Sequence, residues 1–243
     1  MTTPPPPPVT PPPPTPPPPP PSQPPGVAPI DRIHAAYQQR ASTDYVFTGP
    51  GMNIFLTIIT CGIFGFILFY QLMKRDREHN RRRFELLDAT NTYAWERAQD
   101  AGVADELRPA FERTAANLAV LRSLTMEFRD PGIWVVISIF ASTIAYIVGF
   151  IFIDQDLERH DRAEVAIESD LAAIFARLGM SLPTADASRI KGKHNYAGRI
   201  IATIASCGLY SYWWLYDMQV EGNAHLEQNW PWEDALQAAL PVA

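Results

Sequence analysis

The sequence predicts an all-α membrane protein with three transmembrane helices, joined by polar and amphipathic helical loops and preceded by a disordered Pro-rich tail. Two observations carry this prediction. Eighteen of the 24 prolines fall within the first 29 residues, which therefore cannot bury a core. Three later stretches of about 20 residues are almost entirely apolar, whereas a globular domain distributes its apolar residues by period.

Composition also excludes several classes of function. The chain has 243 residues, with 20 basic and 26 acidic side chains and a net charge of −6. Because no strongly basic region offsets this acidity, nucleic acid is not a predicted partner. Apolar residues gathered into blocks exclude a soluble enzyme.

The N-terminal tail comprises residues 1–29, and a short helix and linker are expected over 30–51. Consecutive prolines fix φ and lack an N–H donor, so the tail should adopt an extended, solvated polyproline II conformation. The tail is a candidate docking ligand or kinase substrate, but we favour a stiff spacer.

Three apolar runs are expected to cross the bilayer as single helices, at 52–73, 133–153 and 200–218. The 22 residues of the first run give about 33 Å of helix, enough to cross the hydrocarbon core. The third run is the shortest, and its tyrosines and tryptophans fit an interfacial aromatic belt. A buried helix of a soluble protein is the alternative for each run.

Self-similarity suggests three repeat units, at 52–101, 133–182 and 198–243, separated by a polar helical loop (102–132) and a linker (183–197). A shift of 146 residues places Cys61-Gly62 on Cys207-Gly208. Shifts of 81 and 146 residues place His79 on His160 and on His225, respectively. A degenerate repeat is favoured over chance similarity between apolar helices.

Two eleven-residue stretches, 60–70 (TCGIFGFILFY) and 206–216 (SCGLYSYWWLY), carry a family resemblance. They resemble the signature of a bacterial membrane domain of unknown function, which reads roughly Thr-x-Gly-Ile-Tyr-x-x-x-Trp-x-Tyr along a transmembrane helix. The resemblance implies a small, multi-span membrane protein of bacterial type. It implies no activity, because the family brings none.

No catalytic residue, cofactor or metal site is predicted. Zinc-ligand pairs, phosphate loops and nucleophile elbows are missing from the sequence, so an enzyme is not expected. The three aligned histidines invite a metal site, but successive spans would end on opposite membrane faces and separate His160 from His79 and His225. We therefore expect solvated juxtamembrane histidines.

Basic residues at 74–83, just after the first apolar run, bear on membrane orientation. Anionic lipid is one candidate partner for them, but we favour their retention in the cytoplasm by the positive-inside rule. That choice gives a slight bias toward an external N-terminus.

Small residues recur every fourth position in each apolar run, as expected where helices pack in lipid. We predict that these residues form the mutual packing faces, with the cysteines acting as small packing residues rather than a disulfide. The packing set is Thr57, Cys61, Gly65, Ala141, Ala145, Gly149, Thr203, Cys207 and Ser211.

The predicted function is that of a structural or interaction protein, a scaffold or accessory subunit, in the inner (plasma) membrane. Its expected partners are the lipid bilayer and either other membrane proteins or further copies of itself. A component of a transport or channel assembly is the alternative. The apolar runs argue against that alternative, because their only charged residue is Asp217, at the end of the third run, and charged residues inside a span mark ion and substrate paths.

Overall fold

The structure, a computed structural model, describes residues 26–126 and 130–241. Within these ranges the chain forms seven α-helices and one short 3₁₀ helix, with no strand. The all-α class predicted from the sequence is therefore confirmed. Nearly all of the predicted Pro-rich tail, residues 1–25, lies outside the described residues.

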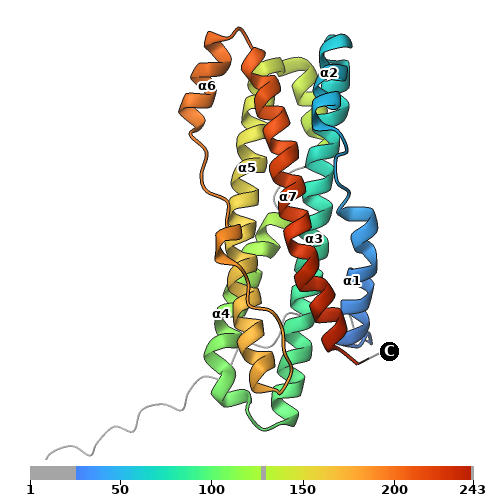
Figure 1. The fold of residues 1–243 in the computed structure, drawn as a ribbon, viewed down its shortest axis with the longest axis vertical. Coiled ribbons are helices and arrows are strands. Elements are labelled where there is room, and N and C mark those ends of the chain that lie inside the picture. Colours follow the sequence, from blue (N-terminus) through green and yellow to red (C-terminus); the bar gives the residue numbers. More distant parts are fainter. Residues whose placement is uncertain (1–25, 127–129, 242–243) are drawn as a thin grey trace, which may run out of the picture.

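Three long helices run side by side along the long axis of the molecule (Figure 1). They are α3, the part of α5 that follows a reversal near its start, and α7, and these three run in the same direction from the same end. α4 returns antiparallel against α3 and α5, and α1 packs on α3. The helix bounds are α1 Pro29–Thr43, α2 Pro50–Ile59, α3 Ile63–Asp100, α4 Ala104–Met126, α5 Pro131–Arg177, η1 Ala187–Arg189, α6 Tyr196–Ala205 and α7 Leu209–Ala239.

The first and third apolar runs are not single helices, so the spans predicted at 52–73 and 200–218 are wrong in this respect. A tight turn separates α2 from α3, and a matching turn separates α6 from α7. Cys61 and Gly62 have φ of 50° and 91°, and Cys207 and Gly208 have φ of 51° and 92°. Two successive left-handed residues reverse the chain, and glycine adopts that conformation without a Cβ penalty.

The second apolar run also folds back, although its residues stay helical within α5. The rings of Trp134 and Phe152 lie 5.5 Å apart between centroids. In a straight helix, eighteen residues span about 27 Å, so the chain must reverse direction between these two side chains. The predicted span 133–153 is therefore a hairpin as well, and α2/α3, the first part of α5 and α6/α7 form three apolar hairpins.

No described helix combines the length and the apolar character that a bilayer crossing requires.

Two apolar clusters fill the interior on either side of a polar layer. The cluster next to the hairpins includes Leu68, Phe69, Phe150, Trp214 and Met218. The aromatic-belt prediction required Trp214 to be exposed at a membrane interface. Instead, Trp214 is fully buried in this cluster. The second cluster lies farther along the long helices and includes Leu86, Leu121, Ile167, Phe175 and Trp232.

The small residues of the predicted packing faces divide into two groups. Thr57, Gly65, Ala145, Gly149 and Thr203 are buried, and Ser211 is half-buried. At two of these positions a larger side chain would clash. A Cβ on Gly65 would lie 2.9 Å from Thr57 Cγ2, and a Cβ on Gly149 would overlap the ring of Phe69.

Cys61, Cys207 and Ala141 are exposed instead of packed between helices. The cysteines are free thiols. Both occupy the reversing turns, so their side chains point out of the bundle and not along a helix face.

Replacing Gly62 by alanine distinguishes a hairpin turn from a continuous helix. At φ 91° an added Cβ costs about 1–2 kcal/mol, so Gly62→Ala should lower the free energy of unfolding. In a continuous helix the same change should raise it by about 1 kcal/mol. Thermal and denaturant unfolding in detergent measure the sign, and Gly192→Ala, which has open space around it, is the control.

Candidate functional site

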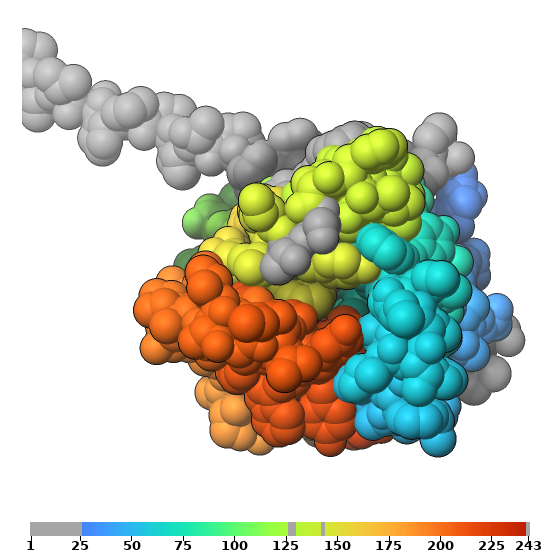
Figure 2. All heavy atoms as spheres, turned by 90° about the horizontal axis from the view of Figure 1, so that it is seen from above, coloured from blue at the N-terminus to red at the C-terminus, as the bar shows by residue number. Residues whose placement is uncertain are grey.

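The exposed apolar side chains of the molecule are concentrated at one end. Among the described residues, every large hydrophobic side chain that is exposed lies in the three hairpins, except Val27 and Val220. Phe140 is 86% exposed and Ile144 is 72% exposed. Figure 2 looks down on this end, where the cyan, yellow-green and orange-red lobes of the hairpins meet. Exposed apolar side chains concentrated at one end in this way mark an interaction site.

The two reversing turns satisfy their own backbone donors. Each N–H from Thr60 to Gly65 donates a hydrogen bond within the turn, the Phe64 N–H bonding to the Thr60 hydroxyl. The second turn repeats this pattern from Ser206 to Ser211, with the Tyr210 N–H bonding to the Ser206 hydroxyl. Turns without free N–H groups are compatible with an environment that offers no water.

Below the hairpins, a buried arginine connects three helices. The Arg83 guanidinium, from α3, contacts Glu164 and Glu168 of α5, the latter at 2.6 Å. Its third contact is with Glu233 of α7, at 2.9 Å. All four side chains are fully buried. These carboxylates outweigh the effect of burial and hold the pKa of Arg83 above its ordinary value.

Carboxylates outnumber arginines in this layer. Arg82 contacts Asp44 and also Glu233, at 2.8 Å. Arg189 contacts Glu168 at 2.7 Å. The buried carboxylates in the layer are Asp44, Asp161, Glu164, Glu168 and Glu233, and the buried guanidiniums are Arg75, Arg82, Arg83 and Arg189. Arg40 is partly exposed, and it approaches Asp234 more closely than Glu233.

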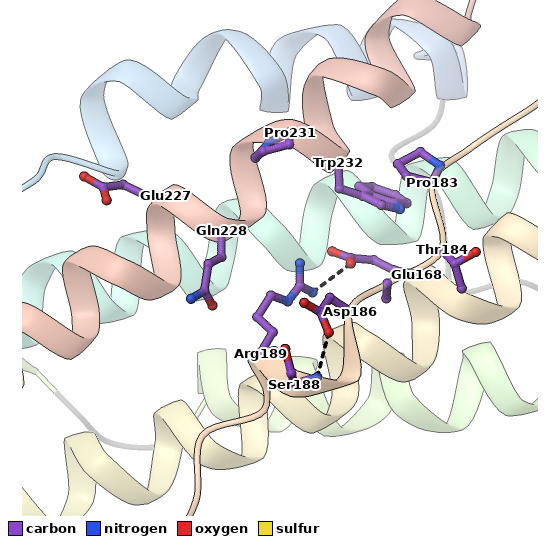
Figure 3. A pocket seen from close by; sticks show the side chains of 11 residues that line it. Glu168, Pro183, Thr184, Asp186, Ser188, Arg189, Glu227, Gln228, Pro231 and Trp232 are labelled. Carbon is purple, nitrogen blue, oxygen red and sulfur yellow. Dashed lines mark hydrogen bonds and ion pairs between the residues drawn. The ribbon is translucent and has the colours of Figure 1, made fainter.

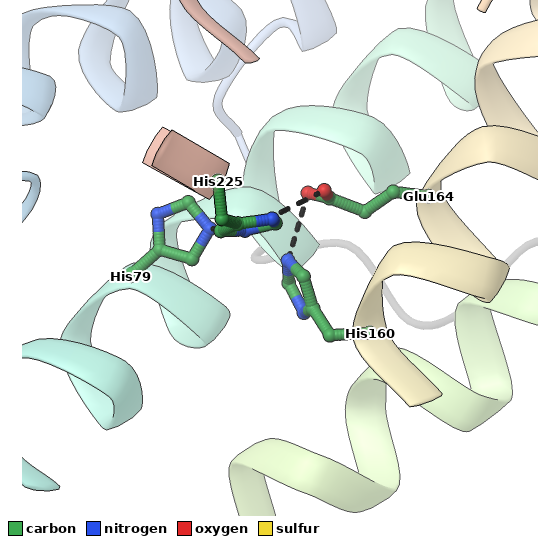
Figure 4. A group of neighbouring side chains, drawn as sticks. All are labelled: His79, His160, Glu164 and His225. Carbon is green, nitrogen blue, oxygen red and sulfur yellow. Dashed lines mark hydrogen bonds and ion pairs between the residues drawn. The ribbon is translucent and has the colours of Figure 1, made fainter. Parts of the chain in front are cut away.

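Three histidines converge within this layer (Figure 4). The ring centroids of His79, His160 and His225 lie 5.0–5.2 Å apart, and all three side chains are buried. The prediction that His160 is separated from the other two, and that all three are solvated, is therefore wrong. Its premise fails because hairpins, unlike spanning helices, send every polar segment out of the same end.

One nitrogen of each histidine points toward a shared centre. His79 Nε2 and His225 Nε2 lie 3.0 Å apart. His160 Nε2 lies 2.9 Å from Glu164 Oε1, yet the angle does not suit a hydrogen bond, and His160 Nδ1 has no partner. Asn229 Nδ2 is 3.2 Å from His225 Nε2 and donates to Glu164.

Carboxylates stand behind two of these rings. Asp44 lies 3.1 Å from His79 Nδ1, and Asp161 lies 2.6 Å from His225 Nδ1. Burial lowers the pKa of His79 to about 3, so this ring is neutral at neutral pH. Burial also acts against protonation of His225, but Asp161 outweighs it and raises the pKa of that ring. In both rings Nδ1 therefore lies beside a carboxylate, and Nε2 faces inward toward the other ring.

An open pocket of about 460 Å³ approaches the polar layer from the side (Figure 3). It lies between α7 and the segment containing η1, and it is lined in part by Glu168, Arg189 and Trp232. Because Glu168 binds both Arg189 and Arg83, the pocket reaches the edge of the buried network.

No protein-family model, curated protein or solved structure matches this chain. The resemblance to the bacterial membrane domain therefore stays a prediction.

Sequence reasoning missed the polar layer apart from its histidines. Arg83, Glu164 and Glu168 look like ordinary charged residues of amphipathic helices. One signal was available: the residues four positions after the three aligned histidines are Arg83, Glu164 and Asn229, which can interact only if the histidines share one level.

Removing the Arg83 charge should strongly destabilise the fold. Arg83→Met leaves Glu164, Glu168 and Glu233 without their common counter-charge, and an uncompensated buried charge costs about 3–5 kcal/mol. Urea unfolding followed by circular dichroism measures the loss. Arg113→Met, which breaks an exposed pair with Asp170, is the control and should change stability little. Equal effects of the two changes would contradict the central role of Arg83.

Proposed function

We propose that this protein is anchored in one leaflet of a bilayer by its three apolar hairpins and presents its polar helical body on a single side. The concentration of exposed apolar side chains at one end carries this proposal. Left in water, that surface would promote aggregation; in hydrocarbon it is at its lowest free energy.

The dimensions of the hairpins fit one leaflet. α2 and α6 each have 10 residues, which correspond to about 15 Å of helix. The hydrocarbon core of a bilayer is about 30 Å thick, so hairpins of this length reach about its midplane. Ion pairs mark the base of the third hairpin, where Arg199 lies 2.5 Å from Asp217.

We further propose that the hairpins are three copies of a degenerate repeat. Equivalent hydroxyls support this: Thr57, Ser138 and Thr203, at the aligned positions, are all buried and all donate to the carbonyl oxygen four residues earlier. The near-identical φ angles of the two Cys-Gly turns support it as well.

A membrane-anchored scaffold or accessory protein is the role that this arrangement favours, with other membrane proteins or further copies as partners. The bundle is held by buried ion pairs, which suits a rigid platform. A transport or channel component stays the alternative, and ion flux through the purified protein in liposomes tests it.

Four labelling positions distinguish hairpins from spanning helices. In a cysteine-free background, single cysteines at Ser42, Asp105, Asp186 and Glu227 report on the segments before, between and after the apolar runs, and all four residues are exposed. Three hairpins place all four on one side, so an impermeant thiol reagent should label all or none in sealed, oriented membranes.

Three spanning helices would give the opposite pattern. Ser42 and Asp186 would then label on one face, and Asp105 and Glu227 on the other. Labelling after detergent treatment controls for reactivity, and an alternating pattern would rule out the one-leaflet arrangement.

A charge at a hairpin tip should weaken membrane association. Phe140→Asp removes a highly exposed apolar side chain and adds a carboxylate, and burying a side chain of this size contributes about 1.5–3 kcal/mol. Partitioning into vesicles, measured by flotation, should fall at least tenfold. Val27→Asp changes an exposed apolar residue outside the hairpins and should leave flotation unchanged.

A further inference from the structure

We propose that His79, His160, His225 and Glu164 together bind one divalent transition-metal ion. The four residues come from all three long helices, and one ligand atom from each lies within 4.8 Å of the others. All four side chains are buried, and their inward atoms face a common centre (Figure 4). This site is independent of the membrane anchor, because it lies in the body of the bundle.

The spacing of the inward atoms is close to that of a ligand sphere. Metal–nitrogen bonds of about 2.0–2.1 Å place neighbouring ligands of a tetrahedral ion about 3.4 Å apart. The observed separations include 3.0 Å between His79 Nε2 and His225 Nε2 and 2.9 Å between His160 Nε2 and Glu164 Oε1. Because no pair of these atoms is more than 4.8 Å apart, binding would bring any pair closer by at most about 1.4 Å, which side-chain rotations accommodate.

Two ring nitrogens directed at each other can share either one proton or one metal ion. Asp44 and Asp161 lie beside the outer Nδ1 atoms of His79 and His225, and a neutral ring with its proton on Nδ1 offers the inner Nε2 as a metal ligand. Asn229 donates toward His225 Nε2, whereas His79 Nε2 has only the opposing nitrogen. A metal ion at this point would bind both Nε2 atoms.

The surroundings match those of known kinds of metal site. A carboxylate behind a ligating histidine fixes its tautomer and raises its basicity, and Asp44 and Asp161 take this position. Both ring nitrogens of His160 are buried and lack a hydrogen-bond partner, so no hydrogen bond accounts for the position of this ring.

The donor set indicates which metals would bind. Three imidazoles and one carboxylate suit zinc, cobalt or iron in the divalent state, whereas calcium and magnesium prefer oxygen ligands. A second group of similar residues, Asp154, His194 and Glu221, does not call for a metal. Lys191 already lies between Asp154 and Glu221 and supplies the positive charge there.

Metal titration of the full-length protein in detergent tests this assignment directly. After treatment with a chelator and dialysis, the protein should bind one equivalent of Co²⁺, with visible absorption typical of nitrogen and oxygen ligands. Zn²⁺ should displace the Co²⁺ and raise the Tm. A folded wild-type protein that binds neither ion would overturn the proposal. The close contact of His79 and His225 would then be explained by a proton shared between their Nε2 atoms.

Matched variants locate the ion. His160→Gln should weaken Co²⁺ binding at least 100-fold, and Asp161→Asn should weaken it 10–100-fold by loosening His225. His194→Gln should leave the affinity unchanged. If circular dichroism shows that His160→Gln does not fold, Asp161→Asn provides the test, because this variant retains all four ligands.

Loss of binding in His194→Gln, with binding intact in the other two variants, would place the ion elsewhere and overturn the assignment. The titration needs no vesicles, so its outcome is separate from that of the labelling and flotation experiments.

Discussion

The register of the three long helices depends on the buried contacts of Arg83. A guanidinium enclosed by Glu164, Glu168 and Glu233 is stable only while all of its partners stay in place, because each carboxylate left alone in the core would be costly. Sliding one helix by a turn, about 5.4 Å, would break that arrangement. This one arginine therefore fixes the relative heights of α3, α5 and α7, and with them the heights of the histidines and of the hairpins.

Apolar layers above and below make these polar contacts strong. The cluster around Phe69 and Trp214 closes the layer on the hairpin side, and the cluster around Leu121 and Phe175 closes it on the other. With little water present, the effective dielectric constant is low, so ion pairs and unpaired polar atoms both carry large energies. The same dryness that stabilises Arg83 leaves the inward nitrogens of the histidines without solvent as a partner.

The sequence was sufficient to predict the helical class, the three apolar runs and the equivalence of the three histidines. It was not sufficient to predict the reversals, because hydropathy measures the length of an apolar run and not whether the run bends. Thr60-Cys61-Gly62 looks like part of a packed membrane helix, and only the backbone shows two successive left-handed residues there. The error about His160 followed from that one, since the face on which each histidine emerges depends on whether a run crosses or returns.

The hairpins make α3, the main part of α5 and α7 parallel, and this arrangement explains both the apolar end and the histidine cluster. Each hairpin returns the chain to the body, while α4 and the segment after α5 carry it back to the apolar end. Equivalent positions in the three helices therefore lie at the same level, which brings three imidazoles together. One turn farther along, the helices differ and carry Arg83, Glu164 and Asn229. Only α5 supplies a carboxylate at that turn, so a set of three equivalent nitrogens acquires a single oxygen as its fourth member.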